Sequence, residues 1–78
     1  MKTQLKDFNT GWYGITFGVK ERDIDDLIEA LKWLKTNTDQ HFHLSSDYEG
    51  EQGVGEIEIY VQNESAKDNM HLQLGEIS

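Results

Sequence analysis

The chain has 78 residues, enough for one domain but too few for two separately packed cores. Hydrophobic residues make up 36% and charged residues 28% of the sequence, a balance typical of globular proteins rather than of disordered chains. Fifteen Asp and Glu against seven Lys and Arg give a formal net charge of −8. This charge argues against direct binding of nucleic acid or an anionic membrane, because phosphate contacts need clustered Lys and Arg. The absence of Cys excludes disulfides, thiolate catalysis, zinc fingers and iron–sulfur clusters.

Apolar residues occur only in short runs, so the sequence predicts no membrane-spanning helix. The polar start of the chain also lacks the apolar stretch of a signal peptide. We therefore expect a single acidic domain over residues 1–78 that works in the cytoplasm.

The first predicted element is a hairpin. Residues 13–19 alternate, with one apolar face that consists of Tyr13, Ile15, Phe17 and Val19. The other face is nearly bare because it carries Gly14 and Gly18. A turn cluster at residues 9–11 precedes this strand, so we expect residues 3–8 to form its partner.

A helix is predicted over residues 23–36, with Asp23 as its N-cap. Its apolar positions recur at helical spacing and form one stripe: Ile24, Leu27, Ile28, Leu31 and Leu34. Polar residues 36–39 end the helix, and Lys32 and Lys35 suit the negative end of its dipole.

Three further strands are predicted after the helix, over residues 41–46, 56–62 and 70–74, with a Gly-rich acidic loop at residues 47–55. Their apolar positions alternate and are Phe42 and Leu44, then Ile57, Ile59 and Val61, then Met70, Leu72 and Leu74. We therefore predict an α+β fold of order β(β)αβββ, with one helix packed on one face of a four- to five-stranded antiparallel sheet.

The sheet face away from the helix collects polar side chains, including all three histidines: Thr16, His41, His43, Glu56, Glu58, Tyr60, His71 and Gln73. Three interpretations stay open. One is a solvated polar face. Another is a protein-binding face in which aromatic anchors are ringed by polar groups. The third is a divalent-metal site built from His41, His43, His71 and Glu58, whose histidines lack the spacing of an established zinc motif.

Acidic residues gather in two segments. The first contains Glu21, Asp23, Asp25, Asp26 and Glu29, and the second contains Asp47, Glu49, Glu51, Glu56 and Glu58. They either provide solubility or steer association with a basic partner.

Trp33 lies roughly opposite the apolar stripe, beside Asp26 and Glu29. It is either a binding hot spot or covered by the N-terminal hairpin or a second copy of the chain.

The sequence offers no convincing catalytic arrangement. Ser45, Ser46, His43 and Asp47 are neighbours on one predicted strand and cannot converge as a catalytic triad must. We therefore expect no catalytic residues, no cofactor and no dedicated metal site.

Residues 26–31 and 39–48 form an acidic, Leu-rich helix followed by a His-x-His strand that ends in Ser-Asp-Tyr. This pattern resembles the small immunity proteins encoded beside bacterial polymorphic toxins, over about a third of the chain. The resemblance implies a non-enzymatic protein that occupies its toxin's surface, with His41, His43, Asp47 and Tyr48 in the contact. The Gly-rich loop and the strand pair over residues 56–74 depart from that pattern.

The sequence as a whole predicts a non-enzymatic inhibitor that binds a basic protein, foremost an immunity protein against a bacterial toxin, as a monomer or homodimer. One alternative is a phage-encoded inhibitor that mimics nucleic acid and blocks a nuclease or CRISPR complex. Another is a metal-dependent small-molecule binder that uses the histidine face. The predicted partner-binding residues are Asp26, Glu29, Trp33, His41, His43, Asp47, Tyr48, Glu49, Glu51, Glu56, Glu58 and Tyr60.

Overall fold

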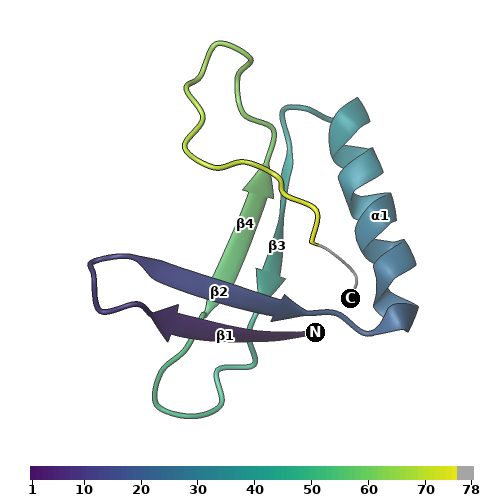
Figure 1. The fold of residues 1–78 in the computed structure, drawn as a ribbon. Helices are drawn as coiled ribbons and strands as arrows, with labels where there is room; N and C mark the ends of the chain where they lie inside the picture. Colours follow the sequence, from purple (N-terminus) through teal and green to yellow (C-terminus); the bar gives the residue numbers. More distant parts are fainter. Residues whose placement is uncertain (76–78) are drawn as a thin grey trace.

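A computed structural model describes residues 1–75 of the chain. It contains, in chain order, strands β1 (Lys2–Asp7) and β2 (Tyr13–Gly18), helix α1 (Glu21–Thr36), and strands β3 (His41–Ser45) and β4 (Glu56–Tyr60) (Figure 1). The predicted α+β class is confirmed. Among the described residues, no helix combines the length and apolar character needed to cross a membrane.

Strands β1 and β2 form the predicted antiparallel hairpin, with Leu5 opposite Ile15. The turn between them needs a left-handed backbone at Asn9 and Gly11, which have φ of 59° and 92°. Two hydrogen bonds close it: the Asn9 amide donates to Asp7 Oδ1 at 2.8 Å, and the Phe8 amide donates to the Trp12 carbonyl at 3.1 Å. The Phe8 ring lies against Gly14, where an added Cβ would meet Phe8 Cζ at 2.7 Å. The bare glycine face therefore accommodates an aromatic ring at this point.

Helix α1 begins at Glu21, two residues before the predicted start. Its N-cap is Lys20, whose side chain makes no capping hydrogen bond, and the Asp23 amide donates to the Lys20 carbonyl at 2.8 Å. The prediction of Asp23 as N-cap is wrong, because this residue already lies in the first helical turn. The predicted end at Thr36 is confirmed, and Asn37 Nδ2 and Thr36 Oγ1 both donate to the Trp33 carbonyl, at 2.9 and 3.1 Å.

The helix turns a different side inward than its apolar stripe predicts. Leu34 is 4% exposed, and among the described residues it is the one hydrophobic side chain that is buried. The half-buried helix positions are Asp23, Leu27 and Ala30, whereas Ile24, Ile28 and Leu31 are exposed. At about 100° per residue, the buried side is rotated by roughly 60° from the centre of the stripe. Part of the apolar stripe therefore faces solvent.

Strands β3 and β4 form a second antiparallel hairpin, close to the predicted boundaries of residues 41–46 and 56–62. The Ser46 amide donates to the Gly55 carbonyl at 2.9 Å and extends the ladder by one bond. Burial alternates as predicted at Phe42, Leu44, Ile57 and Ile59, which are half-buried, with exposed residues between them. The prediction is wrong for Val61, which follows the end of β4 and is 40% exposed.

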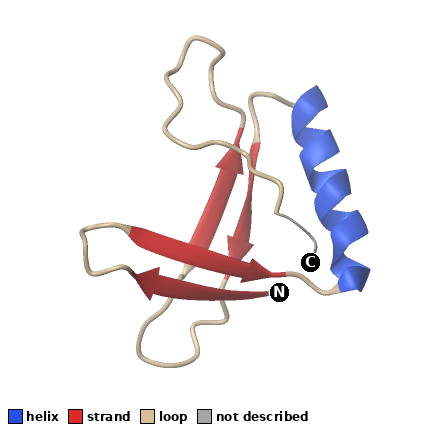
Figure 2. Ribbon diagram, viewed as in Figure 1, coloured by secondary structure: helices blue, strands red, loops and turns tan. Residues whose placement is uncertain are grey.

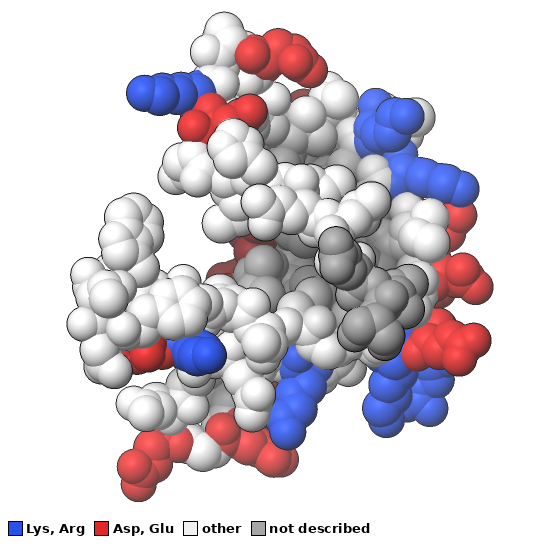
Figure 3. Space-filling view, viewed as in Figure 1, with Lys and Arg blue, Asp and Glu red and all other residues white. Residues whose placement is uncertain are grey.

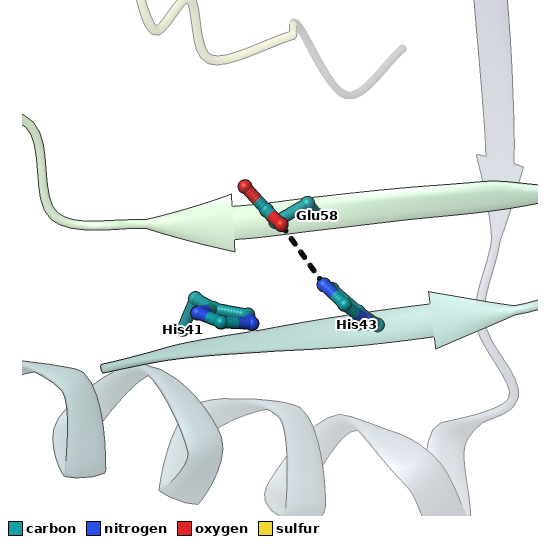
Figure 4. A group of neighbouring side chains, drawn as sticks. All are labelled: His41, His43 and Glu58. Carbon is teal, nitrogen blue, oxygen red and sulfur yellow. Dashed lines mark hydrogen bonds and ion pairs between the residues drawn. The ribbon is translucent and has the colours of Figure 1, made fainter.

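The strands of residues 1–75 form two separate two-stranded sheets, so the structure does not show the predicted single sheet of four to five strands (Figure 2). The β1–β2 hairpin crosses the β3–β4 hairpin, and α1 runs alongside β3 (Figures 1 and 4).

Residues 70–74 do not form the predicted fifth strand. The apolar side chains of this segment, Met70, Leu72 and Leu74, are 83–92% exposed. Before them the chain makes a turn in which Gln62 Nε2 donates to Asp68 Oδ1 at 2.7 Å. Alternation of residue types defines an apolar face, but a strand also needs a free sheet edge whose backbone groups pair with it.

Candidate functional site

The exposed face of the β3–β4 hairpin holds five of the predicted partner-binding residues. The register sets His41 opposite Tyr60, His43 opposite Glu58, and Ser45 opposite Glu56. All six residues are exposed, because side chains at every second position of paired strands share one face. The hairpin therefore brings His41, His43, Glu56, Glu58 and Tyr60 together.

His43 lies between two carboxylates (Figure 4 shows the contact with Glu58). Its Nδ1 is 2.6 Å from Glu56 Oε1, and its Nε2 is 3.0 Å from Glu58 Oε1. The contact with Glu58 is a hydrogen bond, whereas the contact with Glu56 is an ion pair that depends on a protonated imidazole. Both carboxylates are about half exposed, so water weakens these ion pairs and their geometry matters more than their energy.

His41 lies beside His43 on β3, with ring centroids 4.8 Å apart and planes tilted by 33°. His41, His43 and Glu58 each offer one ligand atom, and these atoms lie within 4.8 Å of one another. His71 is not a member of this group, because the described chain forms no strand at residues 70–74 that would bring it there. The predicted set of three histidines is therefore not assembled.

The acidic loop of residues 46–55 continues the same hairpin. Its backbone is held locally: the Tyr48 amide donates to Ser46 Oγ at 2.9 Å, and the Glu49 amide donates to Asp47 Oδ1 at 3.3 Å. Tyr48 has a φ of 59°, and its ring lies against Gly55, where an added Cβ would be 2.9 Å from Tyr48 Cε1. The predicted contact residues Asp47, Tyr48, Glu49 and Glu51 are all exposed on this loop.

An open groove of about 650 Å³ separates the two hairpins. Its walls include Met1, Lys2 and Phe17 from the first hairpin and Leu44, Asp47 and Ile57 from the second. Sequence reasoning did not associate the N-terminus with the acidic loop. Alternation within one hairpin carries no signal for how two hairpins pack on each other, so this juxtaposition appears only in three dimensions.

The remaining predicted contact residues, Asp26, Glu29 and Trp33, lie on α1. Their side chains are exposed, and Glu29 Oε1 is 3.6 Å from Lys32 Nζ one turn along the helix. Among the described residues, none of the three side chains has a hydrogen bond or ion pair to the β3–β4 face. Figure 3 shows acidic groups along the helix and near the loop of residues 46–55, around a largely uncharged centre.

The site thus offers hydrogen-bond acceptors, exposed aromatic rings and two imidazoles on one hairpin. These groups suit contacts with positively charged or hydrogen-bond-donating partners, and the imidazoles suit metal ions. In comparisons with known proteins, no family model, no curated protein and no solved structure matches the chain.

Proposed function

We propose that this chain is a non-enzymatic inhibitor that binds a basic protein through its acidic surface, and that it acts in the cytoplasm as an immunity protein against a bacterial toxin. The observation that carries this proposal is the combination of exposed aromatic rings and exposed carboxylates on the β3–β4 hairpin and its loop. Tyr48 and Tyr60 are 72% and 61% exposed, and Asp47, Glu49, Glu56 and Glu58 surround them in sequence and register.

Exposed tyrosines on a hairpin favour binding over a purely solvating role. Tyr is enriched at protein interfaces, where its ring supplies contact area and its hydroxyl finds a hydrogen bond. Tyr60 lies opposite His41 on this face. The Tyr48 backbone amide donates a hydrogen bond to Ser46 Oγ, and the Tyr48 ring lies against Gly55. A Tyr side chain has only two χ angles, so ordering it in an interface costs little conformational entropy, which favours affinity.

The charge of the same surface indicates what kind of partner it meets. Asp47, Glu49 and Glu51 are exposed on the loop, and the whole chain carries a formal charge of −8. Complementary charge mainly speeds encounter and selects against wrong partners. A basic protein surface therefore fits this face best.

The resemblance of residues 26–31 and 39–48 to immunity proteins supports the choice of a toxin as the partner. The positions it carries over, His41, His43, Asp47 and Tyr48, all lie on the β3 strand or the loop that follows it. The nucleic-acid-mimic alternative uses the same acidic surface, so the experiment separates the two by competition.

The test begins with a pull-down of the bound protein from the native host and its identification. Association is then measured at salt concentrations from about 50 to about 500 mM, a range over which the screening length falls to a few ångströms. The loop variant Asp47→Asn, Glu49→Gln, Glu51→Gln is expected to lower the association rate by roughly tenfold. Tyr60→Ala is expected to raise the dissociation rate instead.

A matched control keeps the net charge equal to that of the loop variant: Asp39→Asn, Glu64→Gln and Asp68→Asn also remove three exposed acids, none of them in the two acidic segments. An association rate that is indifferent to salt and equal in both variants would show that the acidity provides only solubility. Silencing of a toxin without competition by DNA supports an immunity protein, whereas competition by DNA for a nucleic-acid-binding partner supports the mimic.

A further inference from the structure

We propose that His41, His43 and Glu58 form a binding site for a divalent transition-metal ion, with Glu56 as the carboxylate that orients His43. This inference goes beyond protein binding. It also differs from the sequence expectation of no dedicated metal site, and it replaces the sequence-based ligand set, because His71 is not part of the cluster.

The distance between the first two ligands already suits a metal ion. His43 Nε2 and Glu58 Oε1 are 3.0 Å apart (Figure 4). Two ligands of a tetrahedral zinc ion, each about 2.0–2.1 Å from the metal, lie roughly 3.3 Å from each other. An ion can therefore replace the proton between these atoms after a shift of a few tenths of an ångström, and the displaced proton passes to water.

The third ligand comes from the same strand. His41 precedes His43 by two positions and so projects from the same face, with its ring centroid 4.8 Å from that of His43. All three ligand atoms lie within 4.8 Å of one another, so side-chain rotation alone can bring them to coordination distance. The β3–β4 ladder holds the backbone of all three residues in register.

Glu56 supplies the feature that distinguishes this cluster from a chance meeting of polar groups. Its Oε1 is 2.6 Å from His43 Nδ1, an ion-pair contact that favours a proton on that nitrogen. With Nδ1 protonated, the lone pair of Nε2 is free to point at the ion. Histidine ligands in metal sites are almost always oriented in this way by a carboxylate, carbonyl or water on the other nitrogen.

The ligand types indicate the class of ion. Two imidazoles and one carboxylate favour zinc, nickel or copper over magnesium and calcium, which prefer oxygen ligands. Three protein ligands leave a coordination position for water or for a side chain of a partner. Because the ligands are exposed, we expect modest affinity, with a zinc Kd of about 10–100 μM, far weaker than a structural zinc site.

The experiment is a titration of the full chain with zinc chloride by calorimetry, together with the imidazole signals in NMR spectra. We expect one ion per chain and shifts of the His41 and His43 signals but not of the His71 signals. His41→Ala and His43→Ala are expected to weaken binding at least tenfold, and Glu56→Gln by about tenfold. His71→Ala is the matched control and is expected to bind as the wild type does.

Circular dichroism establishes that each variant is folded. If His43→Ala disturbs the hairpin, Glu56→Gln still tests the site, because Gln has nearly the same shape as Glu. The proposal is overturned if zinc does not saturate the wild type below about 1 mM. It is also overturned if His71→Ala weakens binding as much as His41→Ala does, since the histidines would then act as unrelated surface groups.

Discussion

Truncation of Leu34 tests which side of helix α1 is covered in solution. Leu34 is 4% exposed, whereas Leu31 on the same helix is 46% exposed. The structure therefore predicts that Leu34→Ala destabilises the protein clearly more than Leu31→Ala does. The two substitutions remove the same atoms and gain the same small helix propensity, so their difference reports burial alone.

The magnitude follows from the buried fraction of each side chain. Leu→Ala removes three carbons, about 2.4 kcal/mol when they are fully buried at about 0.8 kcal/mol each. Scaled by burial, this gives about 2.3 kcal/mol for Leu34 and about 1.3 kcal/mol for Leu31. A residual cavity adds to the cost at Leu34, so we expect about 2–4 kcal/mol there.

The assay is urea unfolding followed by circular dichroism at several protein concentrations. A free energy of unfolding that falls as much for Leu31→Ala as for Leu34→Ala would refute the reasoning. It would mean that the exposed part of the apolar stripe is covered in solution, and a dependence on protein concentration would identify the cover as a second copy of the chain.

Two further predictions follow from the loop and the helix. Gly55→Ala is expected to shift the Tyr48 ring signals in NMR spectra, because the new Cβ would lie 2.9 Å from Tyr48 Cε1, whereas Gly18→Ala meets only a contact of 3.7 Å and is the control. An unmoved Tyr48 would contradict the packing of this ring on the loop. Any homodimer is expected to weaken in Trp33→Ala, as measured by sedimentation velocity, because burial of this half-exposed ring favours association. If the wild type and Trp33→Ala dimerise equally, Trp33 does not lie in the dimer interface.

The elements that the sequence predicts well are those determined by neighbouring residues. The β1–β2 hairpin follows from alternation on either side of a turn that needs Gly11, and the β3–β4 face follows from the His-x-His and Glu-x-Glu patterns. The sequence also predicts that His41, His43 and Glu58 lie together, because period-two alternation places them on one face, although it adds His71 to the group.

The features that the sequence does not predict depend on packing between elements. The apolar stripe of α1 defines a face but not its rotation against the strands, so the exposure of Ile24, Ile28 and Leu31 could not be anticipated. The segment with Met70, Leu72 and Leu74 has the alternation of a strand, yet whether a sheet edge receives it is a property of the whole fold. His71 does not join the metal-ligand cluster for the same reason: its segment does not pair with the β3–β4 sheet.

Both hairpins join strands that are neighbours along the chain, which has a consequence for how fast the protein folds. Chains dominated by sequence-local contacts fold in microseconds to milliseconds, and a loop of about ten residues closes in roughly 10–100 ns. The sequence has no Pro, so slow prolyl isomerisation cannot delay the process. A newly synthesised chain is therefore expected to form the β3–β4 face early, which fits the proposed role as an inhibitor of a toxin.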